Sequence, residues 1–278
     1  MRGETWRRLA RHRAAMAGLA VLVALVLVGT LAPLLTPYDP IQNRLSEALL
    51  PPSTAHPLGT DYLGRDLLAR LLYGTRFSLF TGFGAIAIGL LVGVPLGVVS
   101  GFLGGWVDLV TQRFVDILLA FPGFLLALSL VAVLGVGLGN VILSVGIGAI
   151  PSFVRLVRAS TLNLRAQPFV EAARSLGVPQ TRIIFRHVLP NTLAPVIVQA
   201  TLSLGSALLV AAGLGFLGLG VQPPTPEWGS MLGEGRQYIF AATNLATFPG
   251  LAIFVAVLAF NLLGDGLRDA TDPRLRTA

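Results

Sequence analysis

The sequence contains neither cysteine nor lysine, and each absence removes a class of chemistry. Without cysteine there is no disulfide, no thiolate nucleophile and no cysteine-based metal or iron–sulfur site. Without lysine there is no phosphate-binding lysine of a P-loop and no amine for a Schiff base. We therefore expect that this chain does not hydrolyse ATP by itself.

Histidine is scarce as well. The three histidines, His12, His56 and His187, lie far apart in the sequence and form no HExxH pattern. That pattern places two zinc ligands on one face of a helix, so its absence argues against a zinc hydrolase. We predict neither catalytic nor metal-binding residues in the chain.

Charged residues are few, and they are unevenly placed. Only 12% of the 278 residues are charged while 54% are hydrophobic, and the mean hydropathy is +0.77. The formal net charge of +7 arises from arginines at the edges of apolar runs, a pattern that reports membrane topology rather than nucleic-acid binding. The sequence predicts an all-α integral membrane protein with no nucleic-acid partner.

The N-terminal region predicts a membrane anchor. Residues 1–13 hold five arginines, and the region 14–36 that follows has no charge. A spanning helix needs about 20 apolar residues, and basic residues mark its cytoplasmic end. A cleaved signal peptide is the alternative, but its apolar core is only about 7–15 residues long. We expect a cytoplasmic tail at 1–13 and a retained first transmembrane helix at 14–36.

Residues 37–75 form the longest polar interval and carry no cationic excess, which predicts an extracytoplasmic segment. Within it, residues 63–74 (LGRDLLARLLYG) place apolar side chains at helical spacing with charged residues between them. An amphipathic helix lying at the outer membrane interface fits this pattern. A loop helix packed on the transmembrane bundle fits it equally well.

Residues 76–265 predict a core of five further helices. The first lies within 77–107, where glycines recur at every fourth position from Gly89 to Gly101 and give a smooth face for another helix. Charged residues at 108–116 predict a short cytoplasmic connection.

The uncharged run 117–154 is too long for one helix and predicts two spans joined by an outer turn at 135–140. A fifth span is expected at 192–212 and a sixth within 238–264. Between them, the glycine- and proline-rich segment 214–237 is expected to be extracytoplasmic, either irregular or re-entrant.

Six spans place both termini in the cytoplasm, including a C-terminal tail at 266–278. With this topology, 15 of the 20 arginines lie on the cytoplasmic side and five outside. The asymmetry supports the assignment, because cytoplasmic loops carry an excess of basic residues.

The stretch 167–191 (QPFVEAARSLGVPQTRIIFRHVLPN) is the most arginine-dense part of the core. It predicts a short helix closed by Gly177, and then a second helix that begins near Pro179 and ends at Pro190. In the second helix, Arg182 and Arg186 share one side. The opposite, apolar side combines Ile183, Ile184, His187 and Val188. Such a hairpin suits either anionic lipid headgroups or a cytosolic protein partner.

The spacing in this stretch resembles the EAA loop of permease subunits of bacterial ATP-binding-cassette importers. The matching residues are Glu171, Ala172, Ala173, Gly177, Leu189 and Pro190. His187 stands where the general pattern has isoleucine, and RIIFRHVLPN resembles the form found in the peptide and nickel branch. The resemblance implies a cytoplasmic coupling loop at 166–191 that docks on an ATPase, and we expect Arg182 and Arg186 to set its electrostatic register.

Four further segments resemble the C-type permease of dipeptide and oligopeptide importers, in the same order. They begin at His56, Gly105, Phe216 and Asn261. The resemblance implies a multi-pass protein of the bacterial cytoplasmic membrane, surrounded by lipid and paired with a homologous B-type permease. It also implies two cytosolic ATPases, which bind ATP and Mg²⁺, and an extracytoplasmic binding protein, with no cofactor in this chain.

The same resemblance implies dipeptides or oligopeptides as cargo, while nickel-chelate or glutathione-like cargo stays open and no residue is assigned to cargo binding. A proton- or sodium-driven secondary transporter is the main alternative. It usually needs an ionisable group deep within a span, whereas every Asp, Glu and His is expected in a loop or near a span end. A structural anchor for an enzyme complex is a second alternative, and it predicts no substrate movement.

Overall fold

A computed structural model describes residues 2–271, with side chains from residue 6 onward. Within this range the regular elements are all helices, so the predicted all-α class is confirmed. Five helices are long and apolar enough to cross a membrane, and the number of spans is six if a bent helix pair counts as one. The five are α2 (Arg13–Leu35), α3 (Leu67–Leu103), α6 (Leu138–Arg165), α9 (Leu189–Phe216) with the helical turns that precede it, and α11 (Asn244–Thr271).

The bent pair consists of α4 (Gly105–Leu119) and α5 (Gly123–Leu134), which meet at 88°. The remaining elements are short. They are α1 (Arg2–Arg11), α7 (Pro168–Ser175), α8 (Gln180–Ile183), a π-helical segment at Ile184–Val188, α10 (Trp228–Gly235), and 3₁₀ turns at Leu45–Glu47 and Arg236–Tyr238.

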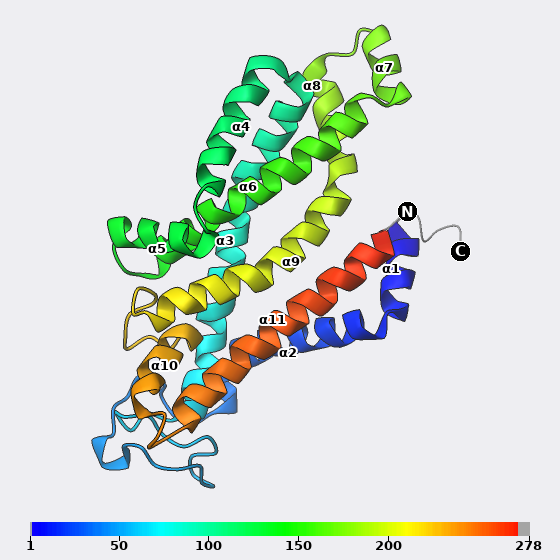
Figure 1. Cartoon of the computed structure of the whole chain (residues 1–278). Helices are drawn as coiled ribbons and strands as arrows, with labels where there is room; N and C mark the ends of the chain where they lie inside the picture. The colour runs from blue at the N-terminus through cyan, green and yellow to red at the C-terminus, as the bar shows by residue number, and fades with distance from the viewer. Residues whose placement is uncertain (1, 272–278) are drawn as a thin grey trace.

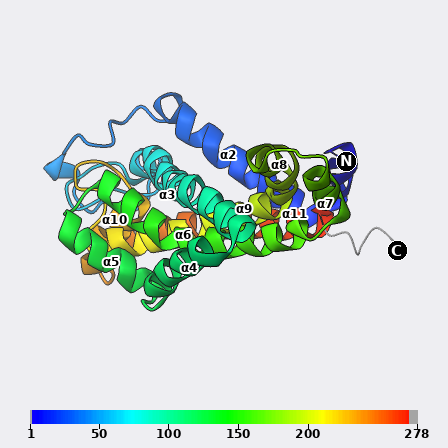
Figure 2. The same cartoon turned by 90° about the horizontal axis from the view of Figure 1, so that it is seen from above.

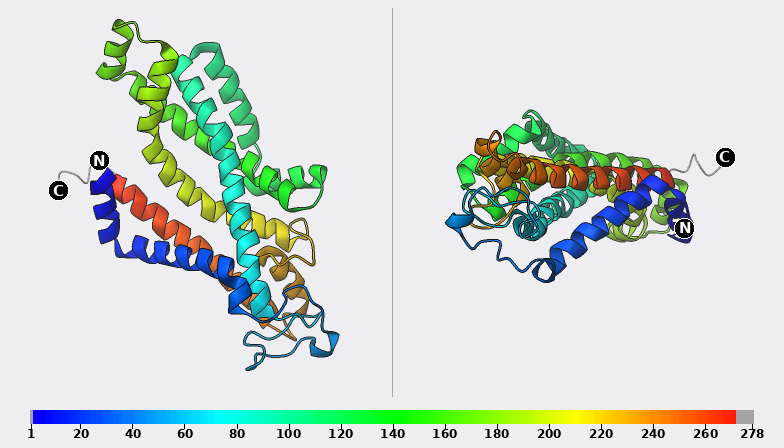
Figure 3. Two further views of the ribbon diagram at one scale, coloured as in Figure 1. Left: turned by 180° about the vertical axis from the view of Figure 1, so that it is seen from behind. Right: turned by 90° about the horizontal axis from the view of Figure 1, so that it is seen from below.

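The long helices connect two distinct ends of the molecule (Figure 1). One end carries α7, α8, α1 and the last turns of α11, and the other carries segment 36–66 and α10 (Figures 1 and 2). Viewed from behind and from below, α2 lies along α11 at the edge of the bundle (Figure 3). Both ends of the described chain therefore lie on the side of α7, as the predicted topology requires. Asp272, Arg274 and Arg276 of the predicted C-terminal tail lie outside the described residues.

The glycine seam of α3 packs against α6, which confirms its predicted role. A Cβ atom added at Gly93 would lie 2.7 Å from the Cβ of Phe153, and one at Gly97 would lie 2.8 Å from the Cβ of Val157. At Gly101 the nearest atom would be a backbone oxygen of α6, at 2.9 Å. Only glycine permits this approach of the two backbones, because real Cβ contacts are longer.

The predicted interfacial helix at 63–74 is not a separate element. Its residues from Leu67 onward form the first turns of α3, and Asp66 caps the helix by accepting a hydrogen bond of 2.7 Å from the backbone N–H of Ala69. Arg70, which the interfacial interpretation placed near headgroups, is buried. The apolar periodicity runs without interruption from this cap into the span, so the helix has no reason to stop.

The predicted cytoplasmic connection at 108–116 is also corrected, because its charged residues lie on helix α4. The chain turns instead at Gly104 and Gly105, both with positive φ. Two carboxylates of α4 are paired with arginines of α6: Arg158 Nε lies 2.6 Å from Asp108 Oδ1, and Arg155 Nη2 lies 2.9 Å from Asp116 Oδ1. These pairs let charged residues remain within a spanning helix.

The C-terminal span is longer than predicted. Helix α11 extends to Thr271, so residues 266–271 of the predicted tail are helical. The predicted outer turn at 135–140 shortens to three residues between α5 and α6, and it is closed by Asn140, whose side-chain amide donates to the carbonyl of Leu134 at 2.9 Å.

A buried network of charged side chains stabilises the end that carries segment 36–66 and α10, which we call the outer end, as opposed to the inner end that carries α7. Arg65 and Arg70 are each 1% exposed, and both guanidinium groups contact Glu234 of α10, at 3.2 and 3.3 Å. Arg65 Nε also donates to Asp61 Oδ2 at 2.6 Å. The planar guanidinium can bridge two carboxylates in this way, so segment 36–66 is tied to both α3 and α10.

Helix α10 gives structure to the predicted irregular segment 214–237. Its cap is Glu227, which accepts hydrogen bonds from the backbone N–H groups of Gly229 and Ser230 and from Ser78 Oγ of α3, at 2.9, 2.9 and 3.1 Å. Burial raises the pKa of the Glu227 carboxyl above its usual value. The neighbouring Trp228 is buried and donates its indole N–H to the carbonyl of Leu71 at 3.1 Å. The segment is thus held inside protein at the outer end of α3.

Candidate functional site

The predicted hairpin at 167–191 is present at the inner end of the molecule. Helix α7 ends where Gly177 takes a φ of +72°, a conformation that glycine adopts without strain. The N–H of Gly177 donates to the carbonyl of Arg174 at 2.9 Å, and that of Val178 donates to Ala173 at 3.1 Å. The first helix is therefore closed as the sequence predicts, and Pro179 occupies the position directly before α8.

The predicted end of the second helix at Pro190 is wrong. The helix continues from Gln180 to Phe216 as one 37-residue span candidate. Its π-helical segment, Ile184–Val188, lies just before Pro190, which falls in the first turn of α9. A π turn bonds each carbonyl to the residue five positions on, so the ring and the missing N–H of proline are tolerated where a regular helix would break.

The interior of the hairpin packs against α3. Ile183 and Val188 are fully buried with Phe102 of α3, which confirms the predicted apolar side of the second helix. Val170 and Ala173 of α7 complete this cluster. Ala173 is 8% exposed, so it joins the two halves of the hairpin and is not free to meet a partner.

The opposite face of the hairpin is exposed. Of the residues predicted for docking, Glu171, Ala172, Gly177, Arg182, Arg186 and Pro190 are exposed and Leu189 is partly buried. Two large apolar side chains that the motif does not contain lie on the same hairpin: Leu176 is 83% exposed and Phe185 is 69% exposed. Leu176 falls at the helix end and Phe185 lies beside Arg186, outside the predicted apolar stripe, so periodicity alone did not select them.

Glu171 makes no side-chain hydrogen bond or ion pair with any residue that the structure describes. It lies in the first turn of α7, where the positive end of the helix dipole favours a carboxylate. By contrast, Arg174 on the same helix places its guanidinium 5.2 Å from the ring centre of Phe102. Glu171 is therefore presented outward, while Arg174 helps to hold α7 on α3.

No part of the described chain offers a metal site, since no three His, Asp or Glu side chains cluster there in a way that could hold an ion. The hairpin instead connects two spans: α7 follows α6, and α8 continues into α9. The hairpin therefore has the character of a binding surface, in which exposed apolar residues lie among side chains of both charge signs.

Comparison with known proteins agrees with this architecture. The profile of the family "Binding-protein-dependent transport system inner membrane component" matches residues 93–277, and that of the "N-terminal TM domain of oligopeptide transport permease C" matches residues 1–52. The described fold is similar to that of the methionine ABC transporter MetNI in an inward-facing conformation, with a TM-score of 0.59, 22% identity, and coverage of 73% of this chain and 97% of that one.

Two relatives are similar over nearly the whole length. The dipeptide transport system permease protein DppC of Alkalihalophilus pseudofirmus is 46% identical over 99% of this chain and 90% of its own. The glutathione transport system permease protein GsiD of Escherichia coli is 48% identical over 98% of this chain and 90% of its own. The chain therefore belongs to the binding-protein-dependent inner membrane family: it is a multi-pass permease of an ABC importer, which works with a separate ATPase and a binding protein.

Proposed function

We propose that the exposed face of the hairpin at 167–191 is the docking surface for a cytosolic ATPase subunit. The observation that carries this proposal is the division of the hairpin into a buried side, packed on Phe102, and an exposed side that presents Glu171, Leu176 and Phe185. Exposed apolar side chains ringed by charges of both signs are characteristic of protein interfaces.

The same surface is poorly suited to anionic lipid headgroups, the alternative left open by the sequence. A lipid-binding helix gathers basic residues on its polar face, whereas here Glu171 is exposed and forms no ion pair in the described structure. Arg182 and Arg186 are also exposed, and they supply the electrostatic register of the contact with the ATPase.

In the complete importer this chain pairs with a homologous B-type permease, and each permease docks on one of two ATPases. Closure of the ATPases on ATP moves the two hairpins together, and the helix from Gln180 to Phe216 carries this movement into the membrane. The permease pair then alternates between inward- and outward-facing states. The secondary-transporter alternative is set aside, since family membership supplies an ATPase as the energy source.

The cargo is a dipeptide or oligopeptide delivered by the binding protein. The relatives named for dipeptide and for di- and tripeptide transport support this assignment. Glutathione is the second candidate, since relatives named for its transport are equally similar. A reconstituted importer tests the two directly, because uptake of a labelled dipeptide can be measured with glutathione as competitor. The preferred cargo is the one whose uptake persists in a tenfold excess of the other. A tenfold ratio corresponds to about 1.4 kcal/mol of selectivity.

The docking assignment is tested with Gly177→Trp. No atom of the described chain lies within 4 Å of a Cβ at this position, so the indole projects into the proposed interface without a clash. The positive φ adds backbone strain of about 1–2 kcal/mol for any residue other than glycine, and the control variant below shares this strain. We expect the variant to insert in the membrane but to lose the ATPase on co-purification.

Gly218→Trp is the matched control. Gly218 has a similar φ of +78° and equally open surroundings, but it lies at the outer end, after α9. It should retain the ATPase. Equal retention by both variants, with transport still coupled to ATP hydrolysis, would overturn the assignment.

A further inference from the structure

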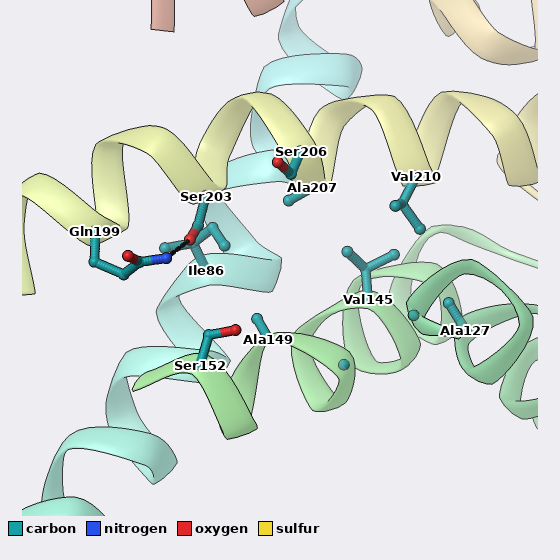
Figure 4. A pocket seen from close by; sticks show the side chains of 12 residues that line it. Ile86, Ala127, Val145, Ala149, Ser152, Gln199, Ser203, Ser206, Ala207 and Val210 are labelled. Atoms are coloured by element: carbon teal, nitrogen blue, oxygen red, sulfur yellow. Dashed lines mark hydrogen bonds between the residues drawn. The ribbon is translucent and has the colours of Figure 1, made fainter. Parts of the chain in front are cut away.

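A cavity of about 230 Å³ opens in the middle of the membrane-spanning region, between α5, α6 and α9, with Ile86 of α3 at its base. Helix α9 contributes Gln199, Ser203 and Ser206, and α6 contributes Ser152. The first two face Ser152 across the cavity in Figure 4. Since α6 and α9 are the two spans joined by the hairpin, the cavity lies on the helices that the ATPase moves.

The walls of this cavity differ from the surfaces that face lipid. Its lining is formed by glycine, alanine, serine, one glutamine and a few aliphatic residues, and it includes no aromatic or charged side chain. Elsewhere the exposed faces of the spans carry large apolar groups, such as Leu91 at 75% exposed, Phe254 at 60% and Leu209 at 57%. Polar groups such as those in the cavity are unfavourable on a surface that faces lipid, because lipid tails offer them no hydrogen-bond partner.

Two hydroxyl groups of the cavity are available for hydrogen bonding to another molecule. Serine and threonine within spans normally donate to a carbonyl of the preceding helical turn, as Thr81 does to Phe77 (2.7 Å) and Ser129 to Leu125 (2.8 Å). Ser152 and Ser206 make no such bond to any described residue and are exposed on the cavity side.

Gln199 adds a second kind of polar group. Its side-chain amide donates to Ser203 Oγ at 3.1 Å, which leaves the amide oxygen and one further N–H for another molecule. A primary amide can pair with a peptide bond in both directions, accepting from its N–H and donating to its C=O. The set of groups is neutral, and it offers donors and acceptors at membrane depth.

We propose that this cavity is the half of the translocation pathway contributed by this chain, and that it holds the uncharged amide groups of the cargo. The proposal rests on the peptide-importer function proposed above. Enclosed ligand pockets measure about 300–1,000 Å³, so a cavity of about 230 Å³ holds only one side of a peptide and leaves the other to the partner permease. A neutral, small-residue wall favours the peptide bond, which all such cargo shares, and is indifferent to its side chains.

Cysteine accessibility tests the location, because the chain has no native cysteine. Single variants Ser152→Cys and Ser206→Cys are compared with Ser129→Cys, which lies on α5 outside the cavity lining and is exposed. In the assembled importer in proteoliposomes, we expect a charged, membrane-impermeant thiol reagent to label the two cavity variants about tenfold faster than the control.

Saturating alanylalanine, with the binding protein and ATP present, should slow labelling of the cavity variants only. If labelling is equally slow at all three positions, the cavity is closed by lipid or by a partner helix and the proposal fails. If labelling is fast but the dipeptide gives no protection, the cavity is a water-filled space that cargo does not occupy, and the proposal also fails.

Gln199→Leu tests the chemistry. Removing the amide should lower alanylalanine uptake about tenfold, the effect of roughly one lost hydrogen bond to the cargo, while ATPase association is unchanged. Gln222→Leu, in the outer segment, is the control, since Gln222 donates only to the carbonyls of Gly218 and Gly220. Normal uptake by Gln199→Leu would refute the role of Gln199, whereas absence of uptake in the unmodified importer would instead refute the proposed peptide function.

Discussion

The two ends of this permease are built on opposite principles. At the outer end, Arg65 and Arg70 are buried and paired with the carboxylates of Asp61 and Glu234. At the inner end, the charged residues of the hairpin, including Glu171, Arg182 and Arg186, are exposed. Buried charges need partners within the protein because leaving water is costly, whereas exposed charges remain available to another molecule. The outer end thus pairs its buried charges internally, whereas the inner end leaves its charges exposed, as the proposed docking of an ATPase requires.

The largest expected effect comes from breaking the outer network. Arg65→Ala leaves Asp61 without its closest cation and Glu234 with one contact fewer, and loss of one partner of a buried ion pair costs about 3–5 kcal/mol. The thermal unfolding of the purified importer should show this loss. Arg44→Ala is the control: its pair with Glu47 is partly exposed to solvent, and pairs near the surface contribute about 0–1 kcal/mol. Equal melting temperatures for the two variants would contradict the contrast drawn between the ends.

A smaller loss is expected from Glu227→Ala. The substitution leaves the N–H groups of Gly229 and Ser230 without their acceptor and removes the bond to Ser78. Unsatisfied buried groups cost about 1–3 kcal/mol. Limited proteolysis at the outer end, compared with Asp39→Ala, an exposed turn residue, checks whether α10 loosens. Protection equal to that of the unaltered chain would show that α10 is held without the cap at Glu227.

The same carboxyl predicts a pH dependence. Burial raises the folded-state pKa of Glu227 above its unfolded value, so its contribution is full below the unfolded pKa and is lost as the pH rises through the folded pKa. The groups facing it are the hydroxyls of Ser78 and Ser230 and the backbone N–H groups of Gly229 and Ser230, none of which titrates in this range. Stability measured against pH should fall by at most about 1.4 kcal/mol per pH unit in that window. Glu227→Gln should flatten this slope, and an unchanged slope would assign it to another group.

The smallest effect on stability, and the sharpest test of the inner end, comes from the double substitution Arg182→Ala and Arg186→Ala. Both side chains are exposed and form no ion pair within the described chain, so stability should change by no more than about 0.5 kcal/mol. ATPase affinity, measured by titration in detergent, should nevertheless fall. Arg174→Ala, which loses the contact with Phe102, should show the reverse pattern. If the double variant lost stability but kept its affinity for the ATPase, Arg182 and Arg186 would be structural residues and not docking residues.

Much of the fold followed from local sequence. Uncharged runs located the spans, and glycines at every fourth position identified the face of α3 that meets α6. The placement of Asp108 and Asp116 did not follow, because the arginines that pair with them lie some 40 to 50 residues later in the chain. A charged residue that indicates a loop when only the sequence is read can instead lie on a helix, where its partner on another helix pairs with it.

The candidate site shows the same limit at single-residue scale. The motif treats Ala172 and Ala173 alike, but only Ala173 is buried, because Phe102 of α3 lies on that side. The continuation of the helix through Pro190 was equally out of reach, since it depends on the π-helical segment before it. Turn chemistry at Gly177 was predictable because its causes lie within the neighbouring residues.

The continuous helix from Gln180 to Phe216 fixes the rotational position of the cavity residues relative to the hairpin. At 1.5 Å per residue its 37 residues follow a path about 55 Å long, so a single helical element connects the hairpin to the opposite end of the molecule. Each residue also turns the helix by about 100°. Inserting one residue between Pro190 and Gln199 would leave both ends chemically intact, but it would turn Gln199 by about 100° relative to the hairpin, away from the cargo site that we propose.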